Sequence, residues 1–228
     1  MKTYLEAFEV QLLENQAETM RDRILIRILF HLGCRVTEAI GQAAEDIDLE
    51  QGLVTIQHLK TRLRLSCSNC GSALGRTHVY CPGCGSSIKD AVTKELEHRR
   101  QRVLPIDSET LRLLKEFIDS GGPVLRNGRH LIFGISRHRA WQIVTRCAGK
   151  AGLPKLTNPD TGKVHYISPH RLRDSFAVNA MKVNDTGDGL RMLQEHMGHA
   201  SFNTTAKYRK ISGQEHRNWY DSLWNKGK

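Results

Sequence analysis

The sequence lacks long apolar runs and has no recognisable secretion signal at its start. No uninterrupted apolar stretch in the 228 residues approaches the roughly 20 that a membrane-spanning helix requires. The opening residues, MKTYLEAFEV, are acidic and amphipathic and do not contain the apolar core of a signal peptide. These absences argue against a membrane-spanning protein and favour one that works in the cytoplasm.

Acidic side chains are too few to balance the basic ones. The chain has 34 Lys and Arg against 24 Asp and Glu, which gives a formal net charge of +10 at pH 7. Such a balance favours a polyanionic partner, either a nucleic acid or an acidic lipid surface. Because no basic amphipathic helix stands out, nucleic acid is the preferred prediction. A chain of 228 residues can form one sizeable core, with or without a small appended module.

Cysteine is scarce, and four of the six cysteines fall in two C-x-x-C-G repeats, Cys67–Gly71 and Cys81–Gly85. In a reducing compartment this spacing favours a metal site over disulfides, and each glycine allows a tight turn around the sulfurs. The expected ligands of a structural Zn²⁺ are Cys67, Cys70, Cys81 and Cys84. Rubredoxin-like iron and a redox dithiol pair remain alternatives, and the segment should need its metal to fold. Cys34 and Cys147 lie in apolar helical contexts and are predicted to be core residues.

The spacing of apolar residues predicts several helices. They lie at residues 4–15, 18–31, 105–119 and 136–151. In the first helix, the apolar residues at helical spacing are Leu5, Phe8, Leu12 and Leu13. Residues 46–49 and 53–58 alternate like a β-hairpin with Gly52 at its turn, and Lys60 lies at the far end of the second strand.

The C-terminal third holds residue types that suit a phosphate site. His170 and Arg173, three residues apart near the start of a helix, are predicted to share one outward face. His199 follows Gly198 at a predicted helix end, and Tyr208 comes nine residues later. Arginine grips phosphate bidentately, histidine moves protons near neutral pH, and a tyrosine hydroxyl serves as a covalent nucleophile. Each residue alone is typical of an ordinary surface, but together they favour a phosphate-binding site.

The same residues form motifs with a known order. H-x-L-R at 170–173, L-Q-x-x-M-G-H at 193–199 and the tyrosine at 208 resemble the tyrosine recombinase, or phage integrase, family. The N-terminal part agrees, because G-C-R-V-T-E at 33–38 resembles that family's G-x-R-x-x-E box. Lys60-Thr61 resembles its β-hairpin lysine, and Q-R-V-L-P at 101–105 resembles the strand that returns from the hairpin. The resemblance covers nearly all of the chain except about residues 62–100.

The resemblance implies a fold and a domain plan. The fold is an α+β, mainly helical tyrosine-recombinase catalytic domain with a small antiparallel sheet and an inserted zinc-knuckle module. Residues 1–61 and 101–212 are the expected catalytic domain, and residues 62–100 the four-cysteine, zinc-ribbon-like module inserted in the β-hairpin. Residues 213–228 are the expected C-terminal tail, which either folds back or docks on a neighbouring protomer, as such tails often do in this family.

The resemblance also implies an activity: site-specific DNA recombination of the integrase, excisionase or invertase type, as found in mobile genetic elements. Double-stranded DNA is cleaved and rejoined through a 3′-phosphotyrosyl intermediate by a dimer or tetramer, with no cofactor for catalysis. The alternatives are strand relaxation of the type IB topoisomerase kind, a catalytically silent DNA-binding regulator, and a plain zinc-dependent binding module.

The resemblance assigns a role to each site residue. Arg35 and Arg173 clamp the phosphate, with Glu38 supporting the clamp, and His199 donates a further hydrogen bond to it. Tyr208 is the nucleophile, His170 assists proton transfer or positions its neighbours, and Lys60 is the general acid. From the residues alone, Arg62 or Arg64 could take the role of Lys60, and Tyr166 or Tyr220 that of Tyr208.

The cysteine-containing insert is flanked by basic residues on both sides. Lys60, Arg62 and Arg64 precede it, and His98, Arg99, Arg100 and Arg102 follow it. The expected hairpin tip touches DNA in the family that the chain resembles. We therefore expect the insert to extend the DNA footprint or to contact a partner protomer.

Overall fold

The computed structural model describes residues 2–58, 61–75, 77–88, 91–97, 100–158, 161–199, 201–209 and 220–224. Its contacts divide the chain into two compact units, Met1–Ile56 with Arg102–Lys228 as the larger and Gln57–Gln101 as the smaller. Lys60 lies outside the described residues. The predicted domain limits, including the tail that starts at residue 213, stay predictions.

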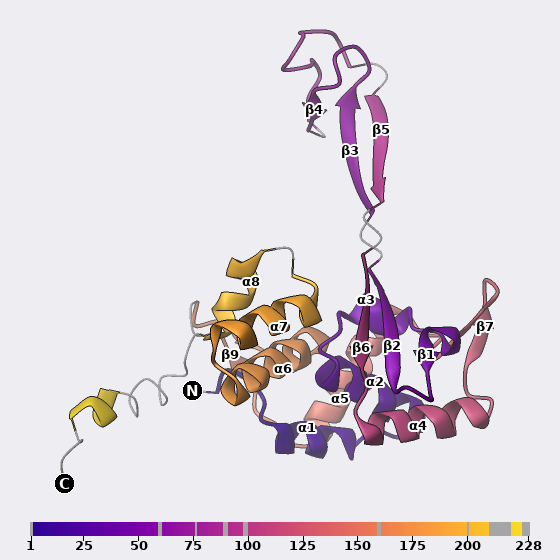
Figure 1. The fold of residues 1–228 in the computed structure, drawn as a ribbon, viewed down its shortest axis with the longest axis vertical. Helices are drawn as coiled ribbons and strands as arrows, with labels where there is room; N and C mark the ends of the chain where they lie inside the picture. Colours follow the sequence, from indigo (N-terminus) through magenta and orange to yellow (C-terminus); the bar gives the residue numbers. More distant parts are fainter. Residues whose placement is uncertain are drawn as a thin grey trace. The chain divides into compact units, whose positions relative to one another are not determined.

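The larger unit is mainly helical, in agreement with the predicted α+β class (Figure 1). Its helices are α1 (Ala7–Glu14), α2 (Met20–His31), α3 (Val36–Ile40), α4 (Ser108–Asp119), α5 (Arg137–Lys150), α6 (Pro169–Val183), α7 (Gly187–Met197) and α8 (Phe202–Ala206), followed by the 3-10 turn η2 (Lys207–Arg209). Helix α2 lies in the middle and packs against α1, α3, α4, α5 and α6. It is buried on most of its circumference because apolar residues occupy nearly every position from Ile24 to Phe30.

The ends of the helices follow from local chemistry. Thr19, Asp107 and Ser136 cap α2, α4 and α5 by accepting a hydrogen bond from the backbone three residues on. Pro169 opens α6, where a missing N–H costs nothing. Gly198 ends α7 in the left-handed conformation, with φ of 63°. The predicted helices at 18–31, 105–119 and 136–151 are therefore confirmed within two or three residues.

Helix α1 departs from the pattern that its spacing predicted. Leu5 and Leu13 are buried, together with Val10. Phe8 and Leu12, however, are 66% and 46% exposed. The helix begins only at Ala7, so Leu5 belongs to the preceding extended segment and does not set the buried face.

Short antiparallel strands complete the larger unit. Strands β1 (Ile47–Asp48) and β2 (Leu53–His58) form the predicted hairpin, with Ile47 opposite Val54. Strand β6 (Arg100–Pro105) adds on the other side of β2. The hairpin β7–β8 (Val124–Arg126 and Arg129–Leu131) and the pair β9–β10 (Leu156–Thr157 and Val164–His165) were not predicted. Both are only two or three residues long, too short to show a period of two.

Two clusters of apolar side chains stabilise this unit. The larger one is built on α2, and the smaller one lies between α6 and α7. The smaller cluster consists of Ala177, Met181, Leu190, Leu193, Met197 and Tyr208. A tyrosine near the end of the described chain is thus held in a core. In the part of the chain that the structure describes, no helix is long and apolar enough to cross a membrane.

The smaller unit is a three-stranded sheet with a cysteine-rich turn region. Strands β3 (Thr61–Cys67) and β5 (Ala91–Glu97) run antiparallel over their full length, and the short β4 (Ala73–Leu74) pairs with the other edge of β3. Cys67 at the end of β3 leads directly into the first C-x-x-C-G turn. The sheet therefore supports the cysteine cluster at one end.

A buried ion network joins three helices of the larger unit. Arg27 of α2 donates to Glu14 of α1 at 2.8 Å, to Asp107 at the start of α4 at 2.7 Å and to the hydroxyl of Thr110 at 2.9 Å. The side chains of Arg27 and Glu14 are only 5% and 1% exposed. Such a pair is sensitive to the loss of one partner, because the other charge then stays buried and uncompensated.

We predict that Arg27→Ala lowers the free energy of unfolding by roughly 3–5 kcal/mol, since it leaves the buried Glu14 carboxylate with only the weaker contact to His31 at 3.3 Å among its described partners. The matched control is Arg112→Ala, which removes an arginine that pairs with Glu109 on the surface and is 58% exposed. That loss should be below about 1 kcal/mol. Urea titrations followed by circular dichroism measure both, and equal losses would show that the network contributes no more than a surface pair.

Candidate active site

Glu38 of α3 gathers arginines from three parts of the larger unit. It is 5% exposed. Its carboxylate accepts from Arg35 Nη1 at 2.8 Å and from Arg102 Nη2 at 2.8 Å, and it lies 3.9 Å from Arg173 Nη1. Arg35 is the N-cap of α3, and its backbone N–H also donates to Glu38, at 2.9 Å. One carboxylate against these three guanidiniums leaves excess positive charge, which suits an anion.

Arg173 is held inside the protein by backbone carbonyls. Its guanidinium donates to the carbonyl oxygen of Gly33 and, at 2.7 Å, to that of Met197. Gly33 must be glycine here, because its φ is +55° and an added Cβ would lie 2.3 Å from the ring of Phe176. Burial and the nearby charge of Arg35 lower the pKa of Arg173 to about 10, so it remains a cation at neutral pH.

The prediction that His170 and Arg173 share an outward face is wrong. Arg173 is 4% exposed, whereas the side chain of His170 is 64% exposed. Three residues advance an α-helix by about 300°, so the two side chains point about 60° apart. That difference is enough to place one against α3 and the other in solvent. Carbonyls and Glu38 offset the desolvation of Arg173.

His199 lies directly against the clamp formed by these arginines. Its Nε2 is 3.1 Å from Arg173 Nη2, and its Nδ1 is 2.9 Å from the hydroxyl of the buried Thr205. Because a guanidinium can only donate, Nε2 accepts and the ring proton is on Nδ1. Burial, followed by the charges of Arg173 and Arg35, lowers the pKa of His199 to about 4. The imidazole is therefore neutral until an anion arrives.

Arg102 packs closely against the end of α7 at Gly198, the residue before His199. Arg102 Nη1 donates to the carbonyl of Met197 at 3.2 Å, the same oxygen that accepts from Arg173. An added Cβ on Gly198, whose φ is +63°, would lie 2.0 Å from Arg102 Nη1. A glycine is thus needed both for the left-handed turn and for the close approach of the guanidinium.

Tyr208 lies next to the clamp, and its hydroxyl is hydrogen-bonded. The residue is 8% exposed, and its ring stacks on that of His199 with centroids 6.2 Å apart. The hydroxyl donates to Asp174 Oδ1 at 2.9 Å. Burial and the charge of Asp174 raise the pKa of Tyr208 above its usual range, so the phenol is neutral. Lys207 Nζ lies 4.8 Å from the ring centroid.

The predicted site residues are therefore largely brought together. Arg35, Arg173, His199 and Tyr208 form one continuous series of contacts. His170 joins it through Asp174, whose Oδ2 is 3.5 Å from His170 Nε2. His196, three residues before His199, instead contacts the carbonyl of Leu32 at 3.1 Å and the ring of Phe176. It lies outside this series of contacts.

Sequence reasoning missed three residues of this site. Arg102 was expected on the basic flank of the insert, but its side chain is 13% exposed and bound to Glu38. Thr205, fully buried, holds His199, and Asp174 holds Tyr208. The one available signal was that Asp174 lies four residues after His170, on the same helix face. The contacts of Arg102 and Thr205 have no such local signature.

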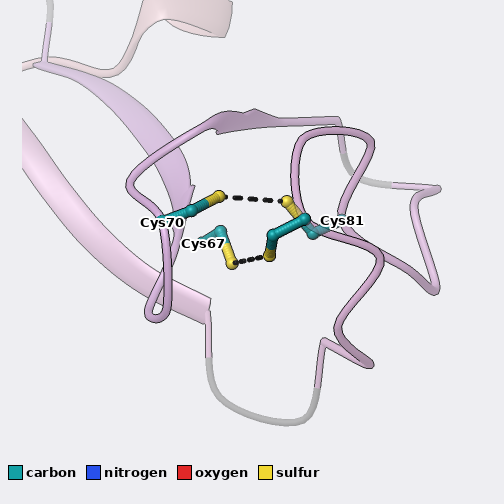
Figure 2. Close-up of side chains that lie close together, drawn as sticks. Cys67, Cys70 and Cys81 are labelled. Carbon is teal, nitrogen blue, oxygen red and sulfur yellow. Dashed lines mark hydrogen bonds between the residues drawn. The ribbon is translucent and has the colours of Figure 1, made fainter.

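The four cysteines of the smaller unit converge (Figure 2). Their sulfur atoms all lie within 4.8 Å of one another, with Cys67 and Cys84 at 3.7 Å and Cys70 and Cys81 at 3.5 Å. A disulfide would need about 2.05 Å. Tetrahedral zinc with bonds of about 2.3 Å places its sulfur ligands about 3.8 Å apart. The cluster therefore fits a tetrahedral metal ion.

The two C-x-x-C-G turns have matching backbone geometry. Gly71 N–H donates to the carbonyl of Cys67, and Gly85 N–H to that of Cys81, both at 2.9 Å. The φ angles of the two glycines are +74° and +69°. The Ser86 hydroxyl, followed by backbone N–H groups, lowers the pKa of Cys67 to about 6, whereas burial raises that of Cys81 to about 11. A bound cation would offset that burial cost.

The two cysteines outside this cluster have no such surroundings. Cys34 and Cys147 are 0% and 1% exposed, and both belong to the larger apolar core. Burial raises the pKa of Cys34 to about 12. Both are core residues, as predicted.

Comparison with known proteins agrees with this geometry. The model of the phage integrase family matches residues 3–68 and 77–215. Tyrosine recombinase XerD of Neisseria meningitidis serogroup B is 27% identical over 201 residues, which cover 85% of this chain and 51% of that protein. Tyrosine recombinase XerD of Bifidobacterium longum is 30% identical over 193 residues, which cover 85% and 50%. The chain spans about half the length of the curated relatives it matches.

Solved structures show the same fold. The crystal structure of XerA recombinase superposes with a TM-score of 0.65 at 19% identity, covering 98% of this chain and 64% of that one. The XerH site-specific recombinase bound to its difH substrate gives a TM-score of 0.59 at 22% identity, covering 99% and 54%. Since the family match includes the arginine clamp, the adjacent histidine and the stacked tyrosine, this chain belongs to the phage integrase family of tyrosine recombinases.

Proposed function

We propose that the protein is a site-specific DNA recombinase that cleaves and rejoins double-stranded DNA through a 3′-phosphotyrosyl intermediate. The observation that carries this proposal is the shared carboxylate of Glu38, which brings Arg35 and Arg173 together beside His199 and Tyr208. Two separated guanidiniums could not hold one phosphodiester. The relative XerH, which has the same fold, is bound to its DNA substrate.

The clamp accounts for the electrostatic part of the reaction. Arg35, with its side chain 32% exposed, is accessible to an incoming phosphate, and Arg173 supports it from within. Fixed guanidiniums stabilise the charge that develops on the non-bridging oxygens in the transition state. A phosphate close to His199 would raise the pKa of its imidazole and allow Nε2 to donate.

The covalent step uses Tyr208 as nucleophile. Its phenol oxygen bonds to phosphorus, the P–O5′ bond breaks, and the 5′ oxygen leaves as a hydroxyl with a proton from Lys60 as general acid. His170 assists proton transfer on the tyrosine side. The phosphotyrosyl bond conserves the free energy of the phosphodiester, so rejoining is the reverse attack and needs neither ATP nor a catalytic cofactor.

The DNA surface is proposed to include α5. An open groove there is lined by Arg139, Trp141, Gln142, Thr145 and Arg146. The ring of His138 stacks on Trp141, which is 44% exposed. The charge of Arg146 is partly neutralised by Glu18, whose carboxylate lies 3.3 Å away. Arg139 is therefore the groove arginine that we expect to contribute most of the positive charge. Cations and aromatic faces of this kind suit contacts with a nucleic-acid backbone.

Assembly on DNA as a dimer or tetramer completes the proposal. In the described part of the C-terminal tail, Tyr220, Leu223 and Trp224 are 53%, 45% and 72% exposed. Apolar side chains of this size gain most from burial against another surface, which supports docking on a neighbouring protomer. A DNA partner and cysteines that bind metal in the reduced form support the proposal that the protein works in the cytoplasm.

Two related functions share parts of this site. A type IB topoisomerase would relax supercoils as a monomer, and a silent regulator would bind the site without cleaving it. Neither needs two protomers to exchange strands. Relaxation assays with single-site plasmids and exchange assays with paired sites separate the three outcomes.

We predict that Tyr208→Phe abolishes the covalent protein–DNA complex on a nicked suicide substrate, because no other group replaces the phenol oxygen. Tyr166→Phe and Tyr220→Phe, which alter tyrosines that are 61% and 53% exposed, should leave the complex intact. Denaturing gel electrophoresis of labelled DNA detects the adduct. Persistence of the adduct in the Tyr208 variant would assign the nucleophile elsewhere.

We further propose that the cysteine cluster holds a structural Zn²⁺, which gives the smaller unit a fold that its few apolar residues cannot. The fit of the sulfur distances to tetrahedral geometry supports zinc. Tetrahedral iron remains the alternative. The metal's chemistry here is structural, and the catalytic residues of the larger unit act without it.

We predict that mass spectrometry under native conditions finds one zinc ion per chain, lost in Cys67→Ser and Cys84→Ser. Cys147→Ala, which removes a thiol outside the cluster, should keep the metal. Chelation should remove hydrogen-exchange protection from residues 61–97 while phosphotyrosyl formation persists. An absorbance band of ferric thiolate, or loss of metal in the Cys147 variant, would contradict this assignment.

The insert is proposed to extend the DNA footprint or to contact a partner protomer. Deleting residues 67–85 and joining the ends with Gly-Ser should weaken binding to a target duplex or reduce assembly on it. Fluorescence anisotropy gives the affinity, and light scattering gives the size of the complex. If neither changes, the insert has a different role.

A further inference from the structure

Asp174 of α6 contacts the reacting hydroxyl, and the roles assigned above make no use of it. Its Oδ1 accepts from the Tyr208 hydroxyl at 2.9 Å. Its Oδ2 accepts from Arg171 Nη1 at 3.0 Å and lies 3.5 Å from His170 Nε2. The side chain is 16% exposed, so this carboxylate is largely enclosed by the groups that it binds.

We propose that Asp174 is the base that accepts the proton of Tyr208 during cleavage and returns it during rejoining. The inference rests on the proposed recombinase function and concerns the same site. The Tyr208 hydroxyl donates to Asp174 Oδ1, whereas His170 Nε2 lies 3.5 Å from the far oxygen of the same carboxylate. His170 therefore assists through Asp174, by stabilising the carboxylate and by sharing its proton.

The step balances without a further reactant. As the phenol oxygen of Tyr208 bonds to phosphorus, its proton passes to Asp174 Oδ1. The P–O5′ bond breaks, and the 5′ oxygen takes its proton from the general acid. In rejoining, the 5′ hydroxyl attacks phosphorus and returns its proton to the deprotonated general acid, the phenol O–P bond breaks, and the neutral carboxyl of Asp174 protonates the departing phenol oxygen.

A carboxylate is basic enough for this role if proton transfer accompanies bond formation. A free phenol is a far weaker acid than a carboxylic acid. Once its oxygen is bonded to phosphorus, however, that oxygen has almost no affinity for the proton. The transfer to Asp174 is therefore unfavourable before attack and favourable at its end, which is the condition for general-base catalysis.

The surrounding groups hold the Asp174 carboxylate in place. Arg171, with its side chain 21% exposed, is hydrogen-bonded to it, and His170 faces it from the same helix. Lys207 lies over the ring of Tyr208, and His199 stacks on that ring. The charge of Arg173 also acts on the phenol and favours its ionised form. The carboxylate thus holds the phenol in the site with its proton already directed at the acceptor.

A different role for Asp174 gives the opposite result. If it merely restrains Tyr208 in a resting position, its removal should release the phenol and accelerate cleavage. Asp174→Asn separates the two roles, because asparagine keeps the shape and an oxygen that accepts the hydrogen bond but cannot take up a proton.

The test measures both directions in single turnover. Cleavage is followed on a nicked suicide substrate, and rejoining is followed after adding a 5′-hydroxyl strand to the isolated covalent complex. We expect Asp174→Asn to slow both steps by roughly 100-fold or more, with unchanged DNA affinity. Asp174→Glu should recover most of both rates. Asp188→Asn, which removes an exposed carboxylate at the start of α7, is the matched control and should change neither rate.

A second readout depends on the acidity of the phenol. The second readout replaces Tyr208 by a fluorinated tyrosine, whose phenol is more acidic, in both the parent protein and Asp174→Asn. The difference between their cleavage rates should then become smaller, because a more acidic phenol needs less help to lose its proton. A purely structural role for Asp174 predicts no narrowing.

The outcomes are distinct. Cleavage by Asp174→Asn at the parent rate or faster would overturn the inference while leaving the recombinase proposal intact. Slow cleavage with normal rejoining would also overturn it, because one base must serve both directions. Absence of a covalent complex in the parent protein would instead reject the proposed function. If Asp174→Asn fails to fold, Asp174→Glu provides the test, because it keeps a carboxylate that can act as the base. Cleavage and rejoining that are both slowed by roughly 100-fold in Asp174→Glu would then count against the inference.

Discussion

The site depends on one buried carboxylate. Glu38 neutralises part of the charge of Arg35, Arg102 and Arg173, which would otherwise repel one another at this distance. It is supplied by α3, whereas Arg102 comes from β6 and Arg173 from α6. The ion cluster therefore also ties together elements that are far apart in the sequence. Its net positive charge suits the phosphate that the proposed function requires, in addition to its structural role.

The second constraint is the small core between α6 and α7, which holds Tyr208 beside the clamp. Thr205 and Arg173 fix both ring nitrogens of His199, and His199 in turn supports the tyrosine ring. The site is thus preorganised in the absence of DNA, with a neutral imidazole and a neutral phenol. In the proposed function, a bound phosphate would raise the pKa of His199.

The two units are stabilised in different ways. The larger one is organised by a helix, α2, that is buried on most of its circumference, together with the Arg27 network. The smaller one has a sheet of three strands and a cluster of thiols, and four metal bonds can replace the hydrophobic core that so short a segment cannot form. We therefore expect the proposed metal to affect the stability of this unit and not the arginine clamp.

The sequence alone determined the features that depend on neighbours along the chain. Caps at Asp107 and Ser136, the left-handed turn at Gly198, the spacing of the cysteines and the motifs around Arg35, Arg173 and His199 all rest on local geometry. The family motifs extended this to most of the proposed catalytic residues. Lys60 and its role stay predictions, since the residue lies outside those that the structure describes.

Only the tertiary structure decided which of these side chains are buried and what they contact. Periodicity gives the relative direction of two residues on a helix but not the side on which the rest of the protein lies, so Arg173 was expected to face outward although it is buried. Arg102 reaches Glu38 and Met197 across 64 and 95 residues, and no local pattern encodes such pairs. Asp174 acquires its part in the site only because η2 brings Tyr208 back against α6, a contact made 34 residues along the chain.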